Sequence, residues 1–195
     1  MSRARVAGLA LLAGLLCGCS SHVTPYPTAW AALSLGGLGC HDVAGTYAQA
    51  GERGPGGRSG EDPPLMWLAT GKENPAAAGS IARVSFPEAD VFEIKGGDVA
   101  RWRFSDGSVS CRGSRVKLRR STLGKSWLGP TWHFETISLA KSADGWLVAE
   151  HEEITWALLL FIPGRERAVD WYRYPPATAS SENAPPESTP PVRPP

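Results

Sequence analysis

The feature that most constrains this chain is a two-residue alternation of apolar and polar side chains that begins near residue 81. Residues 82–86 read ARVSF, and the same alternation recurs at residues 92–95, 100–104 and 115–119. Successive side chains of a β-strand point to opposite faces, so this period is typical of strands with one buried face. Turn segments such as Ser105-Asp106-Gly107 separate the runs and favour hairpins.

The sequence therefore predicts a mainly all-β domain, an antiparallel meander of about eight or nine strands that forms a barrel or a sandwich. One short helix is predicted near residues 65–71, because Pro63 and Pro64 precede the segment LMWLAT and Gly71 follows it.

Two stretches depart from simple alternation. Trp132 and Phe134 occupy even positions, whereas Ile137 and Leu139 occupy odd ones. This change of parity predicts a β-bulge near Thr136. Residues 156–162 are apolar at every position, which predicts a strand covered on both of its faces.

Composition excludes some functions. The 195 residues suit one ordinary domain, and a formal net charge of +1 gives no general attraction to nucleic acid. Eight Trp residues can supply a small aromatic core.

The N-terminus carries a targeting pattern. Arg3 and Arg5 precede an uncharged run at residues 6–16, which is shorter than the roughly 20 residues that span a bilayer and matches a secretory signal instead. Leu16-Cys17-Gly18-Cys19 resembles the lipobox of bacterial lipoproteins. A plain secretory signal and a Cys-x-Cys metal pair are the alternatives, but the segment is otherwise apolar and His22 is the one nearby residue that could add a ligand, which disfavours the metal pair.

The lipobox resemblance implies that residues 1–18 are a signal peptide and that Cys19 carries acyl chains, which bind the protein to a membrane. Ser20 stands where lipoproteins retained in the inner membrane have Asp, so the resemblance implies the outer membrane, with the body facing the periplasm. Residues 19–39 are then a lipidated tether, residues 40–174 the β domain, and residues 175–195 a disordered Pro-rich tail.

Export also bears on the remaining cysteines. Cys40 and Cys111 would stand in an oxidising compartment, where they most simply form one disulfide. Closing that 72-residue loop contributes roughly 4 kcal/mol by chain entropy. A free reactive thiol is the alternative.

Motifs for catalysis are incomplete. Gly124-Lys125-Ser126 lacks the first glycine of a phosphate loop, and residues 54–60 (GPGGRSG) lack the preceding strand of a dinucleotide loop. His151-Glu152 begins like a zinc-protease helix, but Thr155 replaces the second His. We therefore predict no catalytic residues, no metal site and no cofactor, and an enzyme is disfavoured.

One charged cluster suggests binding. Five cations alternate along two neighbouring runs and would share a face if those runs pair, forming a patch for an anionic envelope component or an acidic protein: Arg101, Arg103, Arg115, Lys117 and Arg119. The alternative is a solvated face with Glu93 as an ion-pair partner.

The start of the domain, Cys40-x-Asp42-x-x-Gly45-Thr46-Tyr47, resembles that of a group of small uncharacterised proteobacterial lipoproteins, with His41 in place of their Pro. Phe161-Ile162-Pro163 and Trp171-Tyr172-Arg173-Tyr174 are similar to the closing strands of that group. A weaker similarity is to lipocalins, which have Gly-x-Trp where this chain has Gly45-x-Tyr47.

The resemblances imply an outer-membrane lipoprotein but no particular activity. With the charged cluster as a docking face, we predict a structural or interaction role in the cell envelope. The alternative is a lipocalin-like carrier of a small apolar ligand. A cavity distinguishes the two, because a barrel filled by its own side chains cannot carry a ligand.

Overall fold

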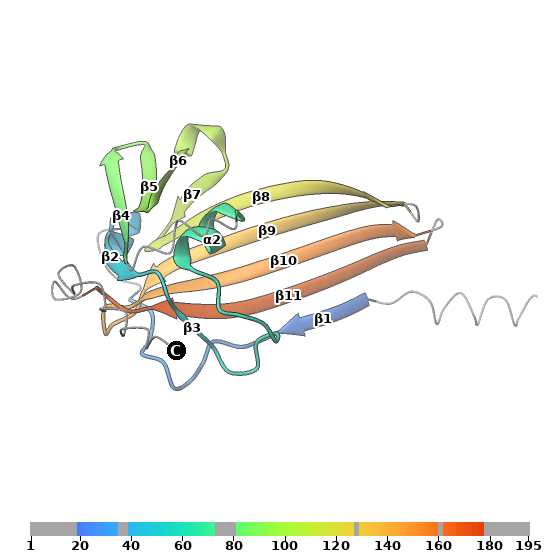
Figure 1. Cartoon of the computed structure of the whole chain (residues 1–195), viewed down its shortest axis with the longest axis horizontal. Coiled ribbons are helices and arrows are strands. Elements are labelled where there is room, and N and C mark those ends of the chain that lie inside the picture. The colour runs from blue at the N-terminus through green and yellow to red at the C-terminus, as the bar shows by residue number, and fades with distance from the viewer. Residues whose placement is uncertain (1–18, 35–38, 73–80, 127–128, 160–161, 178–195) are drawn as a thin grey trace, which may run out of the picture.

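The computed structural model describes residues 19–34, 39–72, 81–126, 129–159 and 162–177, and it places the named strands of these residues in two sheets (Figure 1). The prediction of a mainly β fold with one short α-helix is confirmed. Neither sheet closes on itself, so the arrangement fits a sandwich and not a barrel. The predicted signal peptide lies outside the described residues, as does the tail beyond residue 177.

The larger sheet has seven strands, and its main path runs in the order β1-β11-β10-β9-β8-β7. Its strands are β1 (Cys19–Val23), β3 (Glu52–Arg53), β7 (Val109–Arg112), β8 (Arg115–Ser126), β9 (Gly129–Lys141), β10 (Leu147–Leu159) and β11 (Ile162–Tyr174). β1 pairs with β11 in parallel, and the other pairs are antiparallel. β8, β9, β10 and β11 lie side by side in sequence order, each antiparallel to the next, as the alternation and turn signals predict.

The smaller sheet is an antiparallel set of four strands in the order β2-β4-β5-β6. Its strands are β2 (Gly45–Ala48), β4 (Ile81–Glu88), β5 (Val91–Gly96) and β6 (Asp98–Arg103), with a register shift between Ser85 and Glu88. Two 3-10 helices, η1 (Gly39–Val43) and η3 (Phe104–Asp106), lead into β2 and β7.

The predicted helix is confirmed as α2 (Leu65–Thr70). It buries Leu65, Met66, Leu68 and Ala69, and it ends at Gly71, whose φ of 70° suits a residue without Cβ. Gln49 holds the first turn, because its backbone oxygen accepts from Leu65 N–H at 3.0 Å and its Oε1 accepts from Met66 N–H at 3.0 Å.

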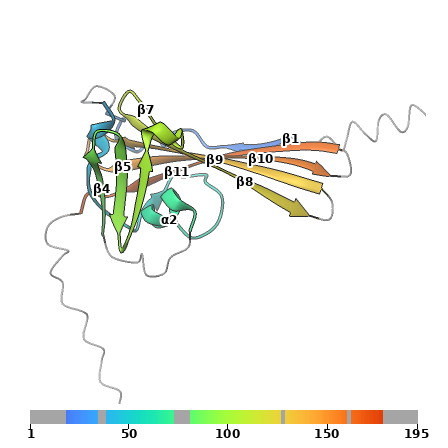
Figure 2. The ribbon, with the colours of Figure 1, turned by 90° about the horizontal axis from the view of Figure 1, so that it is seen from above.

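The main core lies between the smaller sheet, α2 and one half of the larger sheet (Figure 2). Its largest fully buried side chains include Tyr47, Phe92, Leu139 and Tyr174. The hydroxyl group of Tyr174 donates a hydrogen bond to the backbone oxygen of Pro63 at 2.9 Å. For Tyr47, burial raises the pKa of the hydroxyl group to about 12.

The four longest strands extend well past this core. β9, β10 and β11 each have 13 residues, or about 43 Å of extended chain. Only one half of that length is covered by α2 and the smaller sheet, and the other half projects as a twisted ribbon (Figures 1 and 2). We call this projecting part the distal half.

The projection corrects two predictions. The apolar run at residues 156–162 is not covered on both faces over its described side chains, since Trp156 is 43% exposed. The predicted bulge near Thr136 is also wrong, because β9 keeps an unbroken register with both β8 and β10. The parity changes because the two halves of β9 are apolar on opposite faces of the sheet.

The predicted tether differs from the structure over residues 19–34. Cys19–Val23 form β1, and Leu33 makes an isolated bridge to Ser142. Composition alone favoured a flexible segment, but the open edge of β11 offers backbone hydrogen bonds to any extended chain. Residues 35–38 lie outside the described residues.

Candidate functional site

The distal half of the larger sheet carries a continuous row of side chains that crosses five strands. Cys19 pairs with Arg165, Arg165 with Trp156, Trp156 with Trp132, and Trp132 with Leu123. Directly paired residues of adjacent strands share a face. We call this set the Cys19 row.

A second row runs beside it on the same face and holds Ser21, Arg167, Ile154, Phe134 and Ser121. The two rows together make an exposed apolar surface, since Leu123, Trp132, Phe134 and Trp156 are 55%, 39%, 45% and 43% exposed. Large apolar side chains clustered in this way mark an interaction surface more often than chance exposure does. We call this face of the distal half the apolar face.

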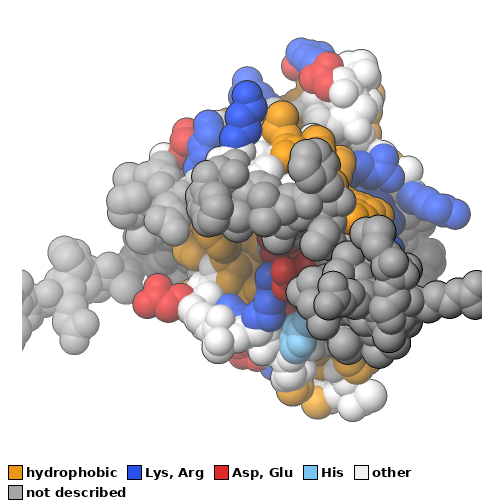
Figure 3. All heavy atoms as spheres, turned by 90° about the vertical axis from the view of Figure 1, so that its right-hand side faces the viewer, with side chains coloured by type: hydrophobic (Ala, Val, Ile, Leu, Met, Phe, Trp, Pro, Cys, Tyr) orange, Lys and Arg blue, Asp and Glu red, His pale blue; other side chains and the backbone are white. Residues whose placement is uncertain are grey.

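Arginine and lysine side chains border the apolar face. The Arg165 guanidinium lies over the Trp156 ring at 5.2 Å, a cation–π contact, and Lys125 lies two residues beyond Leu123 on β8. The Arg167 guanidinium forms an ion pair with the Glu152 carboxylate at 2.8 Å. Glu152 lies at the inner boundary of this region, and beyond it, toward the hairpin ends, the described part of the face has no acidic side chain. Figure 3 views the molecule from this end and shows hydrophobic side chains beside Lys and Arg, together with some Asp and Glu side chains.

The inner half of the same face is covered by the chain itself. Tyr26, Trp30 and Leu33 pack on a small cluster that contains Val169 and Trp171. Trp171 donates its indole hydrogen to the backbone oxygen of residue 24 at 3.0 Å. The segment after β1 thus covers the apolar residues nearest the core and leaves the distal ones exposed.

The opposite face of the ribbon is polar. Arg58 reaches over it from the loop after β3 and contacts Asp170 and Glu153, each at 2.8 Å, while its backbone N–H donates to Asp170 at 3.0 Å. Burial alone would raise the pKa of Asp170, but the hydrogen bonds from Arg58 lower it below its ordinary value. Beside this network, the Nδ1 atom of His133 lies 3.1 Å from the hydroxyl oxygen of Thr155.

His151 is the buried histidine of this polar face. Burial lowers its pKa, so that the neutral ring is favoured, and its Nε2 has no hydrogen-bond partner. Among the described residues no group of three or more His, Cys, Asp or Glu side chains is placed to hold a metal ion. His41 instead packs on the Phe86 ring at 4.3 Å.

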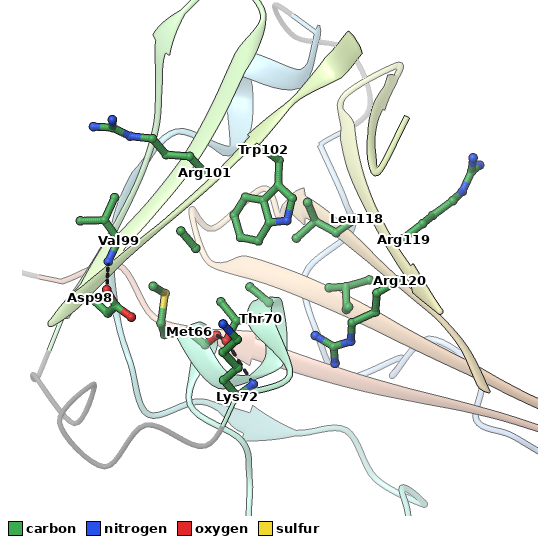
Figure 4. A pocket seen from close by; sticks show the side chains of 13 residues that line it. Met66, Thr70, Lys72, Asp98, Val99, Arg101, Trp102, Leu118, Arg119 and Arg120 are labelled. Carbon is green, nitrogen blue, oxygen red and sulfur yellow. Dashed lines mark hydrogen bonds between the residues drawn. The ribbon is translucent and has the colours of Figure 1, made fainter. Parts of the chain in front are cut away.

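A cleft of about 510 Å³ lies between α2, β6 and β8 (Figure 4). Met66, Trp102 and Leu118 give it an apolar floor, while Lys72, Asp98 and Arg120 bring charge to its lining. Arg120 is held by Glu135 and by the backbone oxygen of Leu68 at 3.1 Å. The cleft therefore combines an apolar base with a charged entrance.

The predicted basic patch is not assembled as the sequence suggested. β6 carries Arg101 and Arg103 in the smaller sheet, whereas Arg115, Lys117 and Arg119 lie on β8 in the larger one. The expected pairing of these strands is wrong because η3 and β7 intervene, and β7 pairs with β8.

Three of these arginines already have acidic neighbours. Arg101 pairs with Glu93, the partner that the solvated-face alternative names. Arg103 lies 3.1 Å from Asp90, and Arg115 lies 3.5 Å from Glu150. Ion pairs of this exposed kind contribute little to stability, but they satisfy the charges locally. A single docking face built from all five cations is therefore not present.

The predicted disulfide is confirmed between Cys40 and Cys111, with a Cα–Cα distance of 5.7 Å. It joins η1 to β7 and so links the start of the domain to the edge of the larger sheet. The free-thiol alternative is wrong for both residues. Cys19 is a free and exposed cysteine at the outer edge of the same sheet.

No family model, curated protein or solved structure matches this chain. Within the described residues, no helix has the length and apolar character needed to cross a membrane. Lipidation and the similarities to envelope lipoproteins and to lipocalins stay predictions from the sequence.

Sequence reasoning missed both the apolar face and the Arg58 network. Two signals of the apolar face were present, namely the parity change in β9 and the apolar run in β10. Nothing in the sequence marked Arg58 as a partner of Asp170, because the two residues are 112 positions apart.

Proposed function

We propose that this protein is a bacterial outer-membrane lipoprotein, attached through Cys19, whose body faces the periplasm and acts by binding rather than catalysis. The lipobox at residues 16–19 carries the proposal. The free and exposed position of Cys19 leaves room for acyl chains, and the Cys40–Cys111 disulfide suits an oxidising compartment.

An interaction role fits the kind of surface that the chain presents. Leu123, Trp132, Phe134 and Trp156 are exposed together on one sheet face, and clustered apolar exposure of this kind is the form that docking surfaces take. His133 contacts the Thr155 hydroxyl at 3.1 Å and the Glu153 carboxylate at 4.0 Å through the same ring nitrogen, Nδ1, so this group does not place the ring between a nucleophile and an orienting acid.

The two cysteines of the lipobox provide a matched test. Intact mass and flotation of membrane fractions should show an acylated protein for wild type and for Cys17→Ala, and an unacylated, non-floating protein for Cys19→Ala. The contrast arises because only the cysteine after the cleavage site receives lipid. Acylation that survives in Cys19→Ala would contradict the proposal.

The cleft that Trp102 lines favours a second candidate, a carrier of a small ligand. Its volume of about 510 Å³ is typical of ligand sites. Because Lys72, Asp98 and Arg120 line it, an amphipathic ligand with a charged group suits it better than a purely apolar one. Native mass spectrometry of protein taken from its own membrane would reveal such a ligand as a discrete added mass, which Trp102→Ala should remove.

A further inference from the structure

We propose that the apolar face of the ribbon lies on the same lipid leaflet that receives the acyl chains of Cys19, so that the protein rests flat on its membrane. This inference rests on the proposed lipidation, and it adds an orientation and a second contact with lipid. The occupant of the apolar face is therefore the bilayer surface.

The position of Cys19 carries the argument. Cys19 is the first residue of β1 and is already paired with β11, so no flexible segment separates a lipid at this residue from the sheet. Neighbouring strands lie about 4.8 Å apart, which places Trp156 about 10 Å and Leu123 about 19 Å from Cys19 along the row. A sulfur held at the bilayer surface keeps this whole row close to the lipid headgroups.

The direction of the side chains supports the same orientation. Cys19, Trp156 and Trp132 point to one face because they are paired in a single row. Acyl chains that enter the bilayer from Cys19 turn that face toward the lipid. The opposite face, with Arg58, Glu153 and Asp170, then points into water, as its charges require.

The chemistry of the face matches a membrane surface. Trp side chains concentrate at the headgroup level of bilayers, where the ring is apolar and the indole N–H remains hydrated. Arg165 and Lys125 at the border can meet lipid phosphates, and the described residues of this half of the face include no acid to repel them. This charge complementarity, together with the site of the anchor, favours lipid over a second protein.

Tryptophan quenching provides the test. The mature protein is purified in mild detergent and reconstituted into phosphatidylethanolamine–phosphatidylglycerol vesicles whose acyl chains carry bromine, which quenches nearby indoles. Flotation of the same vesicles reports the lipid anchor separately. The informative variant is Trp132→Phe/Trp156→Phe, and Trp102→Phe, in the smaller sheet, is the matched control.

We expect bromine-dependent quenching in wild type to fall by about half or more in the double variant, because it removes the two indoles at the lipid, and to be unchanged in Trp102→Phe. Vesicles that float with the protein but show equal quenching in wild type and double variant overturn this inference and leave the proposed function standing. Sedimentation of that protein as a dimer would then assign the apolar face to a second copy. A protein that does not float overturns both proposals.

Discussion

Removing the disulfide should destabilise the folded domain strongly. We consider the double variant Cys40→Ala/Cys111→Ala, which leaves no unpaired thiol at either position. The disulfide closes a loop with a sequence separation of 71 residues. By the chain-entropy relation, loss of that closure costs about 4 kcal/mol, because the unfolded chain regains the freedom that the bond had removed.

Packing adds a smaller loss at one of the two positions. Cys40 is only 2% exposed and belongs to the main core, so Ala in its place leaves a small cavity that costs about 1 kcal/mol more. The total is large compared with the free energy of unfolding of about 5–15 kcal/mol that is usual for a domain.

Urea unfolding, followed by tryptophan fluorescence of the full chain in mild detergent, measures this effect. With a slope near 2 kcal/mol per molar urea, about 4 kcal/mol lowers the midpoint by about 2 M. Wild type treated with reductant should show that shift, and the double variant should shift slightly further. Reductant should then leave the double variant unchanged, which is the internal control.

Two results would refute this reasoning. A midpoint that moves by less than about 0.5 M would mean that the unfolded chain gains little freedom when the bond is lost. A response to reductant that persists in the double variant would mean that another thiol or bond controls stability.

The remaining predictions concern the polar face and a tightly packed glycine. Asp170→Asn should lower the free energy of unfolding by about 2 kcal/mol near neutral pH. This loss is smaller than the loss caused by breaking a fully buried ion pair, because the Arg58 side chain is 38% exposed. Because Asp170 has a pKa below its ordinary 3.8 in the folded protein, its contribution is complete above that pH and is lost as the pH falls below it. Unfolding curves of wild type and variant should therefore converge at acid pH, and a constant gap would argue against the ion pair. Gly51→Ala should destabilise the domain by about 1–3 kcal/mol, because a Cβ there would lie 2.6 Å from the buried Tyr174 ring. Gly124→Ala, where the nearest atom is 3.6 Å away, should leave the thermal midpoint almost unchanged, and an equal loss in both variants would contradict this account.

The candidate site divides between what the sequence could and could not predict. The lipidation of Cys19 stays a prediction from four local residues, because the lipobox is a linear pattern. Trp132 and Trp156 were each predicted as strand residues, whereas Leu123 lies beyond the run predicted at residues 115–119, and the common face of the three was not predicted. That face depends on the registers of three hairpins together, and a shift of one residue in any of them would turn a strand over.

The basic patch failed for a related reason. Arg101 and Arg115 lie on strands that are close in sequence, and strands close in sequence usually pair. Here β7 occupies the place beside β8 and sends the two strands to different sheets. Nothing in the short segment between β6 and β8 indicated whether β6 or β7 would pair with β8.

By itself the sequence determined the β content, most of the turns, the short helix and the disulfide. These follow from side-chain period, from Gly and Pro positions, and from the number of cysteines, all of which are local or countable. Only the tertiary structure decided that β1 joins the sheet edge, that half of the ribbon stays uncovered, and that Cys19 shares a row with two tryptophans. The unpaired backbone N–H and C=O groups of an edge strand can bond to an extended chain of almost any sequence. The pairing of β1 with β11 therefore depends on which strand lies at the edge of the folded sheet.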